Sequence, residues 1–248
     1  MVSRHGGLGD LRIWSDHNMV KTPGGAAPLE AFRASGEGVI AVAPRSVGHL
    51  GAIAAAYRSG HVFLGRIELP VIDVRHYLDD RLDMHHSFAS LALRLRLLQG
   101  KGNSDNHLIW VAQPPFDPTA LALATIDAWL TDGKPDNATD RCLDAEGRLI
   151  ASGEGVWDGG WNGLNTGACL QRFPAFQSPR DAAGGPLTGG VFKCHLKAVN
   201  VALLDGTYGE VDMRPYADHL AQVFPEGVCD YSRPDAGRPA QIAGFDSS

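Results

Sequence analysis

Short apolar runs alternate with amphipathic segments through the first half of the chain. Buried strands are predicted at 38–43, 67–74 and 107–112. Helices are predicted where apolar residues recur at helical spacing, at 49–57, 87–98 and 118–130. Because each predicted strand is followed by a predicted helix, this half is expected to form a parallel sheet with flanking helices, which is the α/β class.

The second half of the chain has a different pattern. From about residue 131, Gly- and Pro-containing turn sequences replace the periodic segments, and only 215–224 predicts a helix. A segment so poor in periodic elements is not expected to build a core alone. We therefore divide the chain into a lead-in or truncated segment at 1–36, a core at 37–130, and a loop-rich extension at 131–248 that packs on the core.

The four cysteines all lie in this loop-rich half, and no two of them form a C-x-x-C pair. An even number in such a region predicts two disulfides and an oxidising compartment, secreted or periplasmic. Three pairings are possible, and we favour Cys142–Cys169 with Cys194–Cys229 because each closes the nearer loop. The alternative is four reduced, buried thiols. The first residues lack the apolar run of a signal peptide, which would fit a fragment of a longer secreted precursor.

Charge narrows the range of partners. The 22 basic and 28 acidic residues give a net charge of −6, and no basic run could neutralise phosphates, so we expect neither nucleic acid nor a membrane as a partner. The ten histidines show no zinc spacing, and no cofactor motif is present, so no metal or cofactor is expected. A homo-oligomer is possible.

Several stretches carry a family resemblance: Leu69–Asp80, Asp83–Phe88, Val191–Lys197 and Phe224–Pro234. Over about residues 65–235 the chain resembles the C-terminal part of an uncharacterised family of secreted bacterial α/β-hydrolase-like proteins. That family is distantly similar to tannase, feruloyl esterase and hydroxybutyrate-oligomer hydrolases. The resemblance implies a partial α/β-hydrolase-like sheet with a disulfide-stapled extension. It also implies Ser–His–Asp hydrolysis of a small-molecule or polymeric ester, whether aromatic, polyester or hydroxyacid-oligomer.

The acid of such a triad would lie in the loop after the strand at 67–74. Asp79 or Asp80 occupies that position, and Asp73, one residue from the end of the strand, is a second candidate.

The general base departs from the α/β-hydrolase pattern, because the histidine expected after the strand at 107–112 is missing. His85 or His86, just beyond the acid loop, is the nearest substitute, since triads are defined by geometry rather than by chain order. The alternative is that both are polar residues of the helix's first turn, hydrogen-bonded to Asp83 or Asp80.

The nucleophile also departs from the α/β-hydrolase pattern, because the chain contains no G-x-S-x-G nucleophile elbow. Ser46 lies between a predicted strand and an Ala-rich predicted helix, the context that an elbow requires. Alternatively, Ser46 is a helix N-cap, or the nucleophile lies in a region outside this chain.

Trp157 and Trp161 lie in a Gly-rich loop, where they could line an aryl- or sugar-binding cleft or pack beneath the loop. The favoured function is a serine carboxylic-ester hydrolase. The alternative is a non-catalytic C-terminal fragment or binding module of a larger hydrolase that lacks its nucleophile.

Overall fold

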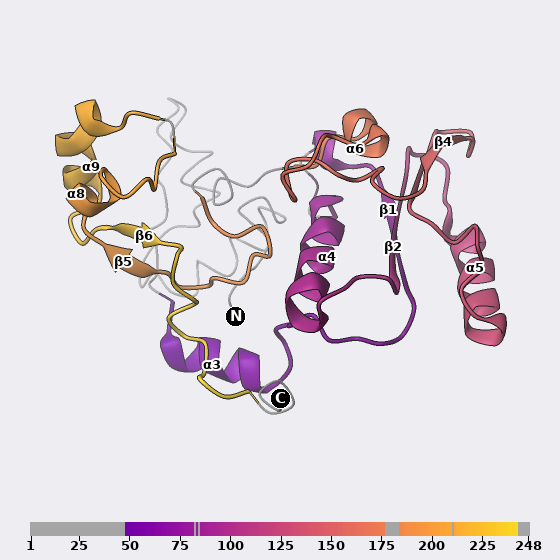
Figure 1. Cartoon of the computed structure of the whole chain (residues 1–248), viewed down its shortest axis with the longest axis horizontal. Coiled ribbons are helices and arrows are strands. Elements are labelled where there is room, and N and C mark those ends of the chain that lie inside the picture. Colours follow the sequence, from indigo (N-terminus) through magenta and orange to yellow (C-terminus); the bar gives the residue numbers. More distant parts are fainter. Residues whose placement is uncertain (1–47, 82, 84, 177–183, 210, 243–248) are drawn as a thin grey trace, which may run out of the picture.

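A computed structural model describes residues 48–81, 83, 85–176, 184–209 and 211–242. Its elements form two groups that are well separated in Figure 1. We call the first group the sheet lobe; it contains β1 (Val71–His76), η1 (Asp79–Arg81), α4 (Phe88–Lys101), β2 (His107–Ala112), α5 (Thr119–Asp132), β3 (Arg141–Leu143), β4 (Leu149–Ser152) and α6 (Ala168–Arg172). We call the other the second lobe; it contains α3 (Leu50–Arg58), β5 (His195–Lys197), α8 (Val199–Ala202), η2 (Arg214–Tyr216), α9 (Ala217–Val223) and β6 (Val228–Asp230).

The sheet lobe has the strand order β1-β2-β3-β4. The β1–β2 and β2–β3 pairs are parallel, whereas β4 runs antiparallel to β3. This mixed sheet with flanking helices confirms the α/β class. Strands β3 and β4 come from the segment that was expected to be loops. They have three and four residues, too few for a periodic pattern to identify them.

Helices α4 and α5 lie on opposite sides of the sheet (Figure 1). On the α4 side, Leu91 packs with Ile109 and Val111. On the α5 side, Ala122 packs with Leu108 and Trp110. Strand β2 is buried at every position because both of its faces are covered.

The ends of β1 and α4 show how local chemistry sets element boundaries. The predicted strand at 67–74 begins only at Val71, because Pro70 has no N–H for the ladder, whereas Val71 N donates to Asn106 O. Helix α4 runs three residues beyond its predicted end, to Lys101. It stops at Gly102, whose left-handed φ of 83° suits glycine.

Helix α3 forms close to its predicted range, but the expectation that it would cover the parallel sheet is wrong. Its buried residues Ile53 and Tyr57 pack with Val62 and Ile242, in a cluster that belongs to the second lobe. Tyr57 also donates a hydrogen bond to Asp235. An apolar stripe of only two buried residues does not specify which surface it will meet, and here long-range contacts decided it.

Both favoured disulfides are present: Cys142–Cys169 links β3 to α6, and Cys194–Cys229 links the residue that precedes β5 to the middle of β6. The late helix predicted at 215–224 is also confirmed, as η2 followed by α9. Among the described residues, no helix is long and apolar enough to cross a membrane.

Candidate functional site

The carboxyl ends of β1, β2 and β3 meet at one edge of the sheet. In parallel α/β sheets this edge is where ligands bind and catalytic groups gather. The loop from Tyr77 to Ser87 leaves β1 at this edge and contains all the predicted acids and bases except Asp73. Its start is fixed by Tyr77 N, which donates to Ala112 O of β2.

Asp79 is buried in this loop and accepts three hydrogen bonds. The donors are Ser87 N at 2.8 Å, Ser87 Oγ at 3.0 Å and Phe176 N at 2.8 Å. The carboxylate therefore ties η1 to the start of α4 and to the chain that follows α6. None of these donors is a histidine. Asp80, its neighbour, is exposed.

His85 has a different carboxylate partner. Its Nδ1 lies 2.8 Å from Asp83 Oδ1, and its backbone N–H donates to the same oxygen at 2.8 Å. These two interactions, the backbone one first, hold the pKa of Asp83 below its ordinary value. The His85 side chain is 69% exposed, and its Nε2 has no hydrogen-bond partner among the described residues. The structure thus joins His85 to Asp83 rather than to Asp79 or Asp80, as the alternative interpretation of these histidines allowed.

His86 lies among aromatic side chains. Its ring centroid is 5.6 Å from that of Phe176 and 6.3 Å from that of Phe88. Nearby, Tyr77 packs on Phe173 with centroids 4.8 Å apart. Burial, with the negative charges of the loop carboxylates, raises the pKa of the Tyr77 phenol. The loop after β1 is therefore bordered by aromatic rings, and its carboxylates act on the Tyr77 phenol.

Asp73 lies away from this edge, on the face of β1 that α4 covers. Arg75 Nε lies 3.0 Å from Asp73 Oδ1, and His107 Nε2 lies 3.8 Å from Asp73 Oδ2. Burial alone would raise the pKa of Asp73, but its interactions with His107, Arg75 and Ser90 outweigh burial and lower it. This cluster lies between the helix and the sheet, where it stabilises their packing.

Beside it, a second buried ion pair fixes α4 to the sheet. Arg94 donates from Nη2 to Asp140 Oδ1 at 2.8 Å and to His107 O at 2.9 Å. Asp140 Oδ1 also accepts from Ile109 N at 2.8 Å. Sequence reasoning missed the Arg94–Asp140 pair and the contact between Asp73 and His107 because the members of each lie far apart along the chain.

Ser46 lies outside the described residues. The helix that would follow an elbow at Ser46 is α3, which lies in the second lobe rather than on the parallel sheet. In the described part of the chain, no serine hydroxyl is hydrogen-bonded to His85, and the nearby Ser87 hydroxyl donates to Asp79. The described residues also contain no group of three or more metal-ligating side chains.

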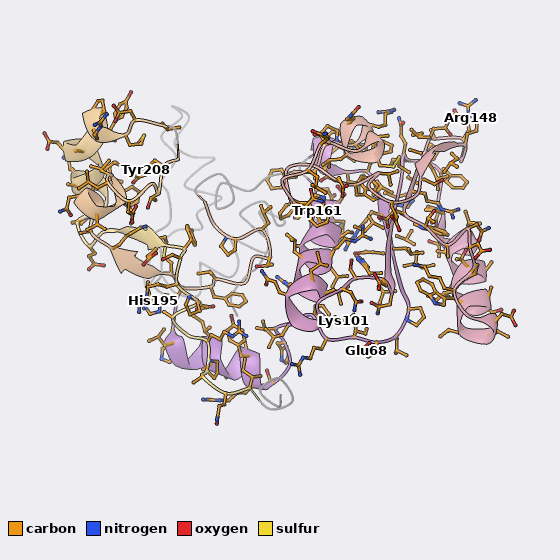
Figure 2. All side chains as sticks on the ribbon, viewed as in Figure 1. Glu68, Lys101, Arg148, Trp161, His195 and Tyr208 are labelled. Atoms are coloured by element: carbon orange, nitrogen blue, oxygen red, sulfur yellow. A yellow bond between two sulfur atoms is a disulfide. The ribbon has the colours of Figure 1, made fainter. Side chains whose placement is uncertain are left out.

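Trp157 is a core residue with only 2% of its surface exposed, and its Nε1 donates to Ile109 O at 3.0 Å. Trp161 is partly buried against the same core cluster, and its Nε1 donates to Trp157 O. Figure 2 marks Trp161 close to α4 and α6. Both indoles therefore have packing roles, and Trp157 has no exposed ring face for a ligand.

These elements define an α/β protein whose polar loop groups gather where parallel strands end. The chain matches the model of a tannase-like family of unknown function (DUF6351) over residues 15–240, and it belongs to that family. No curated protein and no solved structure matches the chain. The tannase likeness that the sequence motifs indicated is thereby confirmed.

Proposed function

We propose that the protein is a carboxylic-ester hydrolase of the serine type, acting on an aromatic, polyester or hydroxyacid-oligomer ester outside the cytosol. Membership of a tannase-like family supports an esterase-type reaction. The two disulfides support an oxidising compartment.

The contact between His85 and Asp83 is the observation that carries the proposal. In a Ser–His–Asp site, the carboxylate holds the Nδ1–H tautomer and stabilises the imidazolium, while Nε2 takes the proton of the nucleophilic hydroxyl. Asp83 contacts Nδ1 of His85, so the lone pair of Nε2 is left on the exposed side of the pair. His85 is thus the general base of the proposed site, and Asp83 replaces Asp79 or Asp80 as the group that orients it.

The remaining step needs a serine. In the proposed reaction its Oγ attacks the ester carbonyl, its proton passes to His85, and the alcohol leaves with that proton to give an acyl-enzyme, which water then hydrolyses. Ser46 remains the candidate within the chain.

The test measures hydrolysis of a short p-nitrophenyl ester together with serine labelling by a fluorophosphonate. His85→Gln should lower kcat/KM by a factor on the order of 10³–10⁴, and Asp83→Asn by a comparable factor. The matched controls are His86→Gln and Asp80→Asn, which change the neighbouring imidazole and a loop carboxylate and should keep most of the activity. Full activity in His85→Gln would exclude this base.

A second candidate is a non-catalytic part of a larger hydrolase. It is favoured by the position of α3, which takes the helix after Ser46 away from the parallel sheet. Peptide mapping of the fluorophosphonate adduct separates the two candidates. Labelled Ser46 supports the enzyme, whereas an unlabelled chain with no ester turnover supports the non-catalytic part.

A further inference from the structure

Strand β1 lies at one edge of the sheet, and half of its backbone groups point away from β2. Val71 N donates to Asn106 O, on the side of β2. Because backbone groups alternate in direction along a strand, the outward-facing residues are the next one and every second one after it: Ile72, Val74 and His76. Within the described ranges, no hydrogen bond satisfies their three N–H and three C=O groups. The edge of β1 is therefore open to another strand.

The two edges of the sheet differ in how readily a strand could add to them. At the opposite edge, β4 has only four residues, and its register with β3 shifts between Cys142 and Leu143. Strand β1 pairs with β2 over all six of its residues without such a shift. Short or bulged edge strands hinder pairing with another chain, whereas a long regular edge is a template for it. Strand β1 is therefore the edge suited to association.

The charges of β1 are complementary to those of a second, antiparallel copy of the same strand. Asp73 and Arg75 lie on the face that α4 covers, with Val74 between them. With a two-fold axis at Val74, Asp73 of each copy lies opposite Arg75 of the other. Such a pair lies between the hydrogen-bonded positions, where facing side chains are closest, and opposite charges stabilise it. In the same register, all the outward N–H and C=O groups of β1 find partners in the other copy.

Other registers of the two strands are less favourable. An axis at Asp73 places two carboxylates opposite each other, and an axis at Arg75 does the same with two guanidinium groups; like charges in these positions are destabilising. An axis two residues away in either direction carries the pairing beyond an end of β1, and on one side it meets Pro70, which has no N–H. We propose that β1 binds a second copy of this chain as an antiparallel pair centred on Val74. The two four-stranded sheets then form one continuous sheet of eight strands.

The side chains on both faces of β1 suit this pairing. On one face, Arg75 Nε contacts Ser90 Oγ and Asp73 Oδ1, each at 3.0 Å. A guanidinium has five N–H groups, so the Nη groups of Arg75, whose side chain is 26% exposed, can also reach the carboxylate of the other copy. On the other face, Ile72 and Val74 are only partly buried against the core. Pairing covers more of their apolar surface, which favours the dimer.

Light scattering of the full chain between about 1 and 100 µM measures the association. The mass should rise from 26.4 kDa towards twice that value, with a dissociation constant on the order of micromolar. Val74→Pro should raise this constant at least about tenfold, because it removes an outward N–H at the axis in both copies but no bond to β2. Val74→Ala is the matched control, since it shortens the side chain but keeps the N–H. A chain that stays monomeric at about 100 µM, or equal constants for the two variants, would overturn the proposal.

Amide hydrogen exchange at two protein concentrations locates the interface. Where the dimer is populated, the amides of Ile72, Val74 and His76 should be protected, and dilution should make them exchange at least about tenfold faster. The amides of Asp73 and Arg75 donate to β2 and should exchange slowly at both concentrations. If the outward amides are unprotected throughout, any dimer forms elsewhere. If they are protected throughout, another segment covers this edge; either result would overturn the proposal.

Arg75→Gln tests the register. It should raise the dissociation constant about threefold or more, because Asp73 of the other copy loses the opposite charge that faces it. Arg81→Gln, at an exposed arginine just beyond β1, is the control and should leave the constant unchanged. An unchanged or tighter dimer in Arg75→Gln would exclude this register, since pairing about Arg75 itself would gain from the loss of like charges. Thermal unfolding of each variant checks folding, and no measurement here depends on ester hydrolysis.

Discussion

The two lobes are held together in different ways. In the sheet lobe, β2 is buried throughout, and apolar clusters on both faces of the sheet contain Trp110, Trp157 and Phe173. In the second lobe the two strands have three residues each, and Leu196, Val201, Leu204, Val211, Tyr216, Val223 and Phe224 are exposed. The sheet lobe is therefore stabilised mainly by its core, whereas the second lobe has a smaller apolar cluster and depends more on a buried hydrogen-bonded carboxylate and a disulfide.

Asp235 is that carboxylate. It is buried and accepts hydrogen bonds from Tyr57 Oη at 3.2 Å, Phe192 N at 2.8 Å and Gly237 N at 2.9 Å. One carboxylate thus connects three segments that are far apart in sequence. The disulfide is Cys194–Cys229. The contrast between the lobes predicts different responses to mutation.

The largest effect is expected from Arg94→Ala in the sheet lobe. It leaves Asp140 charged and buried without its guanidinium partner, which typically costs about 3–5 kcal/mol. Urea unfolding measures the loss. Arg148→Ala is the control, because it breaks an exposed pair and should leave the unfolding midpoint unchanged. Equal midpoints for Arg94→Ala and the unmutated protein would contradict the structural role of the buried pair.

The next largest effect is expected from loss of a disulfide, which should change the stability of the second lobe but not that of the sheet lobe. Replacing both Cys194 and Cys229 by Ala removes a crosslink between residues 35 apart, worth about 3–4 kcal/mol if the chain-entropy account holds. Hydrogen exchange should then accelerate in residues 195–230 while β2 stays protected. Loss of protection in both lobes at once would show that they unfold as one unit.

A smaller effect is expected from Tyr57→Phe, which removes the hydroxyl that bonds Asp235 and Gly190 O. The loss should be about 1 kcal/mol, because Asp235 keeps its backbone donors. Thermal unfolding measures it, with Tyr216→Phe as the control at an exposed phenol. If Tyr57→Phe and Tyr216→Phe have the same melting temperature, the hydrogen bond from Tyr57 to Asp235 does not stabilise the second lobe.

The smallest effect concerns pH. The pKa of Asp73 is lower in the folded protein than its ordinary value of 3.8. The stability contributed by this carboxylate is therefore present above that value and is lost as the pH falls through the folded-state pKa. Between pH 5 and 2, the melting temperature of Asp73→Asn should fall less steeply than that of the unmutated protein. If the melting temperatures of the two proteins fall in parallel with pH, Asp73 does not contribute to the pH dependence of stability.

Part of the fold could be predicted from local sequence. The ranges of β2, α4 and α5 follow from strong periodicity, and the disulfide pairing follows from cysteines that close the nearer loops. Strands β3 and β4 could not be found in the same way, because strands of three or four residues have no visible period.

The candidate site was only partly predictable. Its position, in the loop after β1, followed from the order of the elements, but the partner of His85 depends on a turn geometry that no periodic pattern encodes. The spacing Asp83-x-His85 was the available signal, because an aspartate commonly bonds the backbone two residues ahead.

The sequence by itself determined the longer local elements and the α/β class, and it favoured the cysteine pairing that forms, since each depends on residues close together or on composition. Only the tertiary structure decided that α3 joins the second lobe, that Asp79 fastens a loop, and that Arg94 meets Asp140. Those outcomes depend on which distant surfaces meet and which buried polar groups must find partners. The free energy of such contacts is set by the whole packed chain rather than by any one segment.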